Sequence, residues 1–254
     1  MPLSDQYLID VSLKRDLVPS FAAYPFHLDA VRSLSSLRLH PKVTFLIGEN
    51  GSGKSTLLEA IAVAWGFNPE GGTRNFAFGT YKSHSELHTF LRLSRGARRP
   101  KDGFFLRAES FFNVATEIQR LDEAPSFGPP VINSYGGKSL HAQSHGESFF
   151  ALFSKRFGGR GLYILDEPEA ALSPTRQMAM LARMHQLIEA DSQFIIATHS
   201  PIILAYPDAQ IYQLGREGLT PVAYEDTEHY RVTRDFLARP EYFLKILLDG
   251  SDDD

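Results

Sequence analysis

The sequence predicts an α/β fold with a mainly parallel sheet core flanked by helices. Two observations lead there. Short continuous apolar runs occur at 43–47, 104–106, 162–165, 194–197 and 211–214, and they alternate with segments whose apolar residues recur at helical spacing. Strands that are apolar on both sides are typical of parallel sheets buried between two layers of helices. With 254 residues, the chain is long enough for one large or two small domains.

The remaining elements follow from spacing and from turn residues. An additional strand is expected at 7–13, and the segment 37–47 should hold one or two strands broken at His40-Pro41. A loop rich in proline and glycine is expected at 124–138. Helical spacing predicts helices at 54–65, near 85–93, at 111–121, at 147–157, from Ser173-Pro174 onward and at 242–248.

Composition excludes several classes of protein. The net charge is -4, so bulk charge gives no reason to expect a nucleic-acid binder. The absence of cysteine excludes disulfides and thiolate metal sites and fits a reducing compartment. No apolar run reaches the roughly 18 residues of a membrane span, and the N-terminus lacks a signal-peptide pattern. We therefore expect a soluble, cytoplasmic protein without membrane insertion.

The strongest motif is a phosphate-binding loop between the apolar run 43–47 and the helix predicted at 54–65. It fits the pattern G-x-x-x-x-G-K-[ST]. Glycines let successive backbone N–H groups turn toward a polyanion, and the following helix directs its positive end to the same place. The lysine can reach the β- and γ-phosphates, and the hydroxyl after it can ligate Mg²⁺. The predicted nucleotide-binding residues here are Gly48, Asn50, Gly51, Ser52, Gly53, Lys54, Ser55 and Thr56.

Polar residues follow two of the buried strands. Asp166 ends the run 162–165 and is predicted to hold Mg²⁺ with Ser55, while the neighbouring Glu167 can polarise the attacking water. His199 follows the run 194–197 and can hydrogen-bond the γ-phosphate or the water. Lys54, Glu167 and His199 are thus the predicted catalytic residues.

A fourth motif opens the helix predicted at 147–157. Ser144 can cap that helix, and free N–H groups around Gly146 would form a second anion site. Alone this signal is weak, because many helices begin with serine and glutamate. Its meaning comes from its place in the order of the four motifs.

That order resembles the ATP-binding-cassette (ABC) ATPase superfamily. The matching segments are GENGSGKS, SHGE, LYILDEP and ATHS. The resemblance implies one P-loop NTPase domain over 1–254, with N-terminal antiparallel strands and a smaller helical lobe at about 75–160. It also implies Mg²⁺-dependent ATP hydrolysis and an ATP-dependent homodimer in which Ser144 and Gly146 contact the nucleotide of the partner.

Two departures separate the chain from transporter subunits. Ser173 stands where those subunits usually have aspartate, and Ser144-His145-Gly146 replaces a fuller serine-glycine-glycine signature. The segment DEPEAALSPTRQ resembles the soluble AAA/ABC-type ATPases of the overcoming-lysogenization-defect kind. The resemblance therefore favours an ATPase that switches an unknown protein or nucleic-acid partner, as in DNA repair or phage defence. A transporter subunit and a slow, nucleotide-gated scaffold are the alternatives.

The resemblance points to two further positions. The glutamine loop of the family should follow the strand at 104–106, where this chain has no glutamine, so Glu109 is the candidate to face the metal. The aromatic that stacks on adenine should lie before the phosphate loop, where Tyr24 and Phe26 occur.

Two charged clusters have simpler interpretations. The basic run Arg92, Arg95, Arg98, Arg99 and Lys101 contains no interleaved aromatics, which favours a solvated face over a nucleic-acid contact. The acidic group Glu225, Asp226 and Glu228 with His229 lacks metal-ligand spacing, and we interpret it as solvated too.

Overall fold

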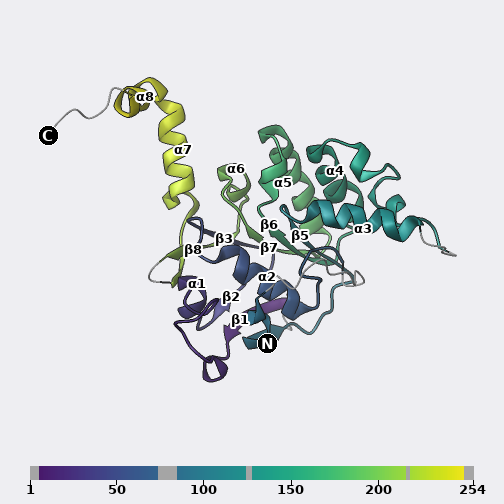
Figure 1. The fold of residues 1–254 in the computed structure, drawn as a ribbon. Coiled ribbons are helices and arrows are strands. Elements are labelled where there is room, and N and C mark those ends of the chain that lie inside the picture. The colour runs from purple at the N-terminus through teal and green to yellow at the C-terminus, as the bar shows by residue number, and fades with distance from the viewer. Residues whose placement is uncertain (1–5, 74–84, 124–127, 216–217, 249–254) are drawn as a thin grey trace.

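A six-stranded sheet forms the centre of the protein, whose computed structural model describes residues 6–73, 85–123, 128–215 and 218–248 (Figure 1). Its strand order is β5-β6-β7-β3-β8-β9, and the pairs from β5 to β8 are all parallel. Only β9 runs antiparallel, against β8. The strands are β3 (Val43–Gly48), β5 (Asp102–Arg107), β6 (Gly161–Asp166), β7 (Gln193–Ala197), β8 (Gln210–Gly215) and β9 (Gly218–Pro221).

A second, antiparallel sheet contains the N-terminal strand of the described chain. It has the order β2-β1-β4, with β1 in the middle. Its strands are β1 (Leu8–Leu13), β2 (Leu37–Arg38) and β4 (Leu91–Arg95). Both sheets confirm the predicted fold class.

Helices flank the central sheet. The α-helices are α1 (Asp29–Arg32), α2 (Lys54–Trp65), α3 (Phe111–Glu123), α4 (His145–Ala151), α5 (Pro174–Glu189), α6 (Pro201–Leu204), α7 (Glu228–Ala238) and α8 (Pro240–Leu248). A π-helical turn, Leu152–Arg156, continues α4. Short 3-10 turns are Arg15–Leu17, Glu86–Phe90, Val131–Tyr135, Leu140–Ala142, Pro168–Ala171 and Tyr224–Asp226.

The central strands divide their side chains between two hydrophobic layers. In β3, Phe45 and Ile47 pack with α3, α4 and α5 on one face, whereas Leu46 packs with α1, α2 and the antiparallel sheet on the other. All six residues of β3 are buried. This arrangement explains why the sequence shows solid apolar runs instead of alternation.

The structure differs from the prediction in two places. The segment 85–93 is not a helix: a 3-10 turn leads directly into β4, which pairs with β1. An apolar pattern as short as Leu87, Leu91 and Leu93 fits either structure, and the partner strand decides. Residues 228–238 form a helix that was not predicted, because α7 buries none of its residues.

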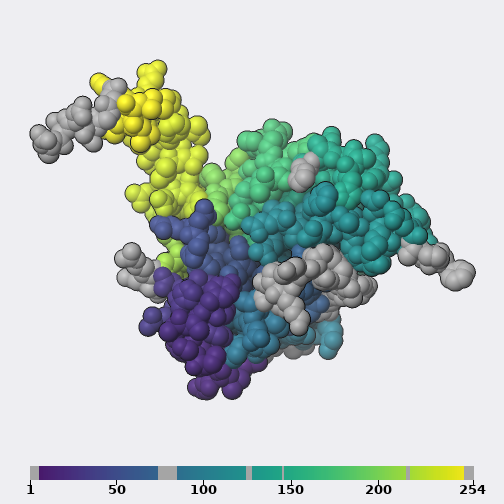
Figure 2. Space-filling model, in the orientation of Figure 1, coloured from purple at the N-terminus to yellow at the C-terminus, as the bar shows by residue number. Residues whose placement is uncertain are grey.

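The last two helices project from the body as an arm (Figures 1 and 2). Like α7, α8 has no buried residue, and it exposes several large apolar side chains: Tyr242, Leu244, Ile246, Leu247 and Leu248. Within the described part of the chain, none of the helices has the length and apolar character needed to span a bilayer. The separation of an inserted lobe at about 75–160 stays a prediction; here α3 and α4 share one hydrophobic layer with the central sheet.

Candidate nucleotide site

The loop between β3 and α2 depends on glycine at both ends. A Cβ at Gly48 would lie 2.7 Å from the Leu214 carbonyl oxygen, so β8 could not pack this closely beside another residue. Gly53 has φ +94, in the left-handed region that favours glycine, and α2 begins at the next residue. The backbone therefore turns sharply between a buried strand and the N-terminal end of a helix.

Lys54 is folded back across this loop. It is 4% exposed, and its Nζ donates hydrogen bonds to the carbonyl oxygens of Gly48 (2.7 Å) and Glu49 (2.9 Å). Burial lowers the pKa of Lys54, against the opposing effect of Glu167, Asp166 and Glu169. A cation held inside a loop of turned amides is the arrangement that binds phosphate.

The predicted metal ligands Ser55 and Asp166 are brought together. The Ser55 hydroxyl donates to Asp166 Oδ1 at 3.0 Å. Burial raises the pKa of Asp166 to about 7, although the Ser55 hydrogen bond and the Arg107 charge act to lower it. Within the described residues, no three His, Asp or Glu side chains are grouped to hold a metal. A hydroxyl and one carboxylate fit Mg²⁺, which takes few protein ligands and completes its shell with phosphates and water.

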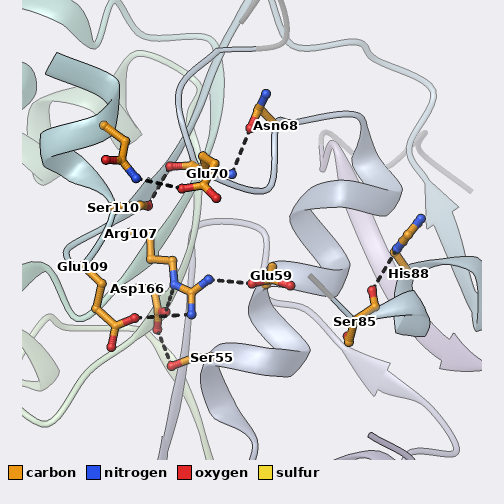
Figure 3. Close-up of polar contacts among 11 residues, drawn as sticks. Ser55, Glu59, Asn68, Glu70, Ser85, His88, Arg107, Glu109, Ser110 and Asp166 are labelled. Carbon is orange, nitrogen blue, oxygen red and sulfur yellow. Dashed lines mark hydrogen bonds and ion pairs between the residues drawn. The ribbon is translucent and has the colours of Figure 1, made fainter. Parts of the chain in front are cut away.

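A cation that the sequence did not lead us to expect lies beside this pair (Figure 3). Arg107, at the end of β5, contacts Glu59 at 2.6 Å and Glu109 at 3.4 Å, and its Nε is 3.8 Å from Asp166 Oδ2. The Glu109 side chain is 82% exposed and reaches Asp166 only through this guanidinium. Of these two side chains, Arg107 is thus the one that lies beside Asp166, and a role for Glu109 in facing the metal stays a prediction.

The loop lies between two clefts that share Asn50 and Gly51. The smaller, of about 280 Å³, is lined among others by Lys54, Ser55 and Glu167. The larger, of about 850 Å³, is lined by His199 and by residues of α7. The smaller cleft thus brings the lysine and the hydroxyl of the motif together with the Glu167 carboxylate.

Glu167 and His199 face each other across the end of the sheet. His199 Nε2 lies 3.8 Å from Glu167 Oε1. Burial lowers the pKa of His199, and the nearby charge of Lys54 lowers it further. Glu167 has φ +49, a left-handed conformation that is rare for a glutamate and places this residue at a turn just after β6. Both side chains thus lie at the positions from which the predicted roles could be carried out.

Glu169 and His229 contact His199, and neither is among the predicted site residues. Glu169 Oε1 accepts the backbone N–H of His199 at 2.5 Å. The Nε2 atom of His229, a residue in the first turn of α7, lies 3.0 Å from His199 Nδ1. The sequence could have indicated Glu169, because it follows Glu167 by two positions. No local pattern predicts that the start of α7 lies beside His199.

The two aromatic residues predicted near the base, Tyr24 and Phe26, differ in exposure. Tyr24 is 63% exposed and lines the smaller cleft. Phe26 is 4% exposed and packs edge-on against Phe90, with ring centroids 4.9 Å apart. Phe26 is therefore a core residue, whereas Tyr24 lines the cleft, and its stacking on a base stays a prediction.

Ser144 and Gly146 lie elsewhere. Neither lines either cleft beside the phosphate loop. Ser144 is the N-cap of α4, as predicted, and both its backbone N–H and its hydroxyl donate to Glu147 Oε2, at 3.1 and 2.8 Å. A Cβ at Gly146 would lie 2.8 Å from the Ala171 carbonyl oxygen, so packing alone explains this glycine.

Comparison with known proteins agrees with this geometry. One family model, described as an AAA domain, matches residues 26–110, which include the phosphate loop. A second matches residues 140–205, which include α4 and His199, and is described as "AAA domain, putative AbiEii toxin, Type IV TA system". No curated protein sequence matches the chain.

Solved structures similar to the chain were also found. An SMC head domain from Thermotoga maritima is 18% identical with a TM-score of 0.42, covering 86% of this chain and 100% of that one. A nucleotide-free ATP-binding cassette from an ABC transporter is 15% identical with a TM-score of 0.43, covering 82% and 90%. An ATP-binding subunit of an ABC transporter is 16% identical with the same TM-score, covering 94% and 98%.

The sheet order and the loop with Lys54 define a P-loop fold. Within that class, the two AAA-domain matches and the position of Asp166 and His199 after neighbouring strands support an ABC-type ATPase.

Proposed function

We propose that the protein binds and hydrolyses ATP with Mg²⁺. One observation carries the proposal: Lys54, Ser55 and Glu167 line one cleft, and Asp166 is hydrogen-bonded to Ser55 behind it. A buried cation, a metal-ligand pair and a free carboxylate are the parts that phosphoryl transfer to water requires. Tyr24, on the rim of the same cleft, would stack on the base.

The phosphates would be held by the loop amides and by Lys54. Its Nζ donates hydrogen bonds to two loop carbonyl oxygens. When nucleotide binds, it would donate to phosphate oxygens instead. Ser55 and Asp166 would hold Mg²⁺, which when bound neutralises charge on the β- and γ-phosphate oxygens. Catalysis on this account is positioning and electrostatics, with Lys54 fixed by its burial.

Water would be oriented by Glu167. Its side chain is 41% exposed, which leaves it open to water, and it lies next to Asp166 in sequence. His199 would donate a hydrogen bond to the γ-phosphate from the opposite side. The 3.8 Å between the two side chains leaves both near one reacting position.

Arg107 would compensate Asp166 when no metal is bound. The guanidinium lies 3.8 Å from Asp166, so a buried carboxylate is not left without a cation. Arg107 already contacts the buried Glu59 and the exposed Glu109, so it would keep carboxylate partners if a bound metal took its place beside Asp166.

We further propose that two copies enclose ATP head to tail. The γ-phosphate of an ATP held by Lys54 would face solvent, and the α4 start of a second copy could cover it with backbone N–H groups. The intrachain contacts of Ser144 support this only partly, because the Glu147 carboxylate must first release the Ser144 hydroxyl. Arg176, 3.9 Å from Glu147, offers that carboxylate another partner.

The dimer would act as a switch on a partner. ATP closes it and hydrolysis loosens it, which is the order-and-release behaviour of nucleotide switches. DNA repair and phage defence are the settings that the family resemblance implies. A pull-down from native lysate with Glu167→Gln and ATP would identify the partner as a soluble protein, a nucleic acid or a membrane permease.

The test of the proposed activity is phosphate release from ATP by the purified protein. We expect turnover with Mg²⁺, none with excess EDTA, and none for Lys54→Ala. Lys245→Ala, a change on the exposed face of α8, is the matched lysine control and should behave as wild type. Magnesium-independent release, or equal release by Lys54→Ala, would contradict the proposal.

A further inference from the structure

His199 and His229 form a pair that the proposed mechanism does not yet use. Their rings lie 5.1 Å apart between centroids, tilted by 48°, and His199 Nδ1 is 3.0 Å from His229 Nε2. His199 follows β7, whereas His229 belongs to the first turn of α7. Both residues line the larger cleft beside the phosphate loop.

A hydrogen bond between two imidazoles needs one donor and one acceptor. At least one ring must therefore be neutral and present a lone pair. Burial lowers the pKa of both residues, and the Lys54 charge lowers both further, against the opposing effect of Glu167 at His199 and of Glu228 and Glu169 at His229. With both rings neutral, only two arrangements of the protons are compatible with the 3.0 Å contact.

The surroundings of His199 distinguish these two arrangements. Its Nε2 is buried, makes no hydrogen bond within the described residues, and lies 3.8 Å from Glu167 Oε1. If His199 donated from Nδ1, a lone pair on Nε2 would face this carboxylate and the γ-phosphate position. If His229 donates instead, His199 carries its proton on Nε2 and turns an N–H toward both negative groups.

The first turn of α7 favours the same arrangement. When His229 donates from Nε2, its Nδ1 keeps a lone pair, and that atom is buried without a hydrogen-bond partner in the described residues. The N-terminal end of a helix is electropositive, so a lone pair is better tolerated there than a second N–H. Thr227 caps this helix by accepting from Tyr230 N, which fixes the turn that carries His229.

We propose that His229 is a positioning residue that holds His199 with its proton on Nε2 and directs that N–H to the γ-phosphate. The inference rests on the proposed ATPase function. Through His229 the projecting helix α7, none of whose residues is buried, contributes to the geometry of the site.

The test combines two substitutions that differ in hydrogen bonding. His229→Gln keeps a side-chain N–H at a position similar to Nε2, and His229→Phe keeps a ring of similar size without it. We expect His229→Phe to lower kcat by roughly three- to tenfold, the effect of one net hydrogen bond, with little change in KM. His229→Gln should recover most of this loss. His185→Phe is the matched control, because His185 lies on α5 and pairs with Tyr206 outside the site.

A second readout does not depend on hydrolysis. Two-bond ¹H–¹⁵N spectra of the histidine-labelled full chain report the tautomer of each ring, and a His199→Gln variant assigns the His199 signals. We expect the Nε2–H form of His199 in wild type and in His229→Gln, and a loss of this fixed state in His229→Phe.

Two results would overturn the inference. One is the Nδ1–H form of His199 in wild type. The other is wild-type kcat in His229→Phe. If no variant and no wild-type protein hydrolyses ATP, the proposed function fails, and the spectra alone then decide whether His229 fixes the tautomer.

Discussion

The phosphate loop and the start of α4 are built from similar residues but differ in what surrounds them. In the loop, Lys54 and Ser55 share a cleft with Glu167, a residue more than a hundred positions away in sequence. At the α4 start, Ser144 is bonded to Glu147 within its own turn, and neither cleft beside the loop includes it. The loop forms its cleft within a single chain, whereas the α4 start is only a capped helix end in a single chain.

The two motifs differ in whether one chain supplies all the residues that a binding site requires. The proposed phosphate site needs only the glycines of the loop and the residues at the ends of β6 and β7, all from one chain. A role for Ser144 in binding ATP needs a second chain, and a single chain shows no more than the cap. The predictions below test each motif separately.

The largest expected effect comes from Glu167→Gln. This change keeps the shape of the side chain and removes the carboxylate that would orient water, so turnover should fall by on the order of 10²–10⁴-fold. ATP affinity should stay within about twofold, since Lys54 and Ser55 are untouched. Steady-state phosphate release and binding of a fluorescent ATP analogue measure the two quantities.

Glu169→Gln is the matched control for this change. Glu169 accepts a backbone N–H from His199 and does not line the smaller cleft. If Glu169→Gln loses more turnover than Glu167→Gln, the water-orienting carboxylate has been assigned to the wrong residue.

Lys54→Ala should weaken nucleotide binding by more than about tenfold, because it removes the buried cation from the loop. The fluorescent analogue again gives the affinity, and circular dichroism checks that the fold is kept. Unchanged affinity in a folded variant would mean that the loop is not the phosphate site.

Ser144→Arg should leave ATP binding to a single chain unchanged and prevent the ATP-dependent dimer. The added side chain occupies the space that a γ-phosphate from a partner would need. Light scattering measures the molecular mass of Glu167→Gln with ATP, of the same variant with ADP, and of the double variant Glu167→Gln/Ser144→Arg with ATP. Ser94→Arg, on the exposed side of β4, controls for the added charge. A dimer that persists in Ser144→Arg would remove α4 from the interface.

The smallest effect is expected in the basic run. Arg95 lies 4.5 Å over the Trp65 ring and Arg98 pairs with Asp191 at 3.4 Å, so part of this charge is already engaged. We expect only weak, salt-sensitive DNA binding at physiological salt, and no change on replacing Arg98 and Arg99 by alanine. Fluorescence anisotropy with a labelled duplex is the measurement. Tight binding lost in the double variant would make this run a third anion site.

The sequence predicted those parts of the fold that local rules determine. The helix α2 has the predicted ends, because Gly53 and Gly66 are both left-handed and mark them. The strand β4 was mistaken for a helix, because only its pairing with β1 distinguishes the two. Helix α7 was missed because it buries no apolar stripe.

The site follows the same division. Asp166, Glu167 and His199 could be found because each follows an apolar run. The contact between Arg107 and Asp166 could not, since it comes from the register in which β5 pairs with β6 and sets these two residues opposite each other. The contact between His199 and His229 depends on where the start of α7 lies relative to the end of β7, which no local pattern encodes.

The central claim is that a complete site combines the loop of one chain with the α4 start of another. Mixing Lys54→Ala with Ser144→Arg tests it directly, because each variant alone lacks one half of every site. In the mixed dimer, the loop of the Ser144→Arg chain meets the intact α4 of the Lys54→Ala chain. The account predicts ATP hydrolysis well above the sum of the two separate variants. Full activity of Ser144→Arg alone, or no recovery on mixing, would contradict it.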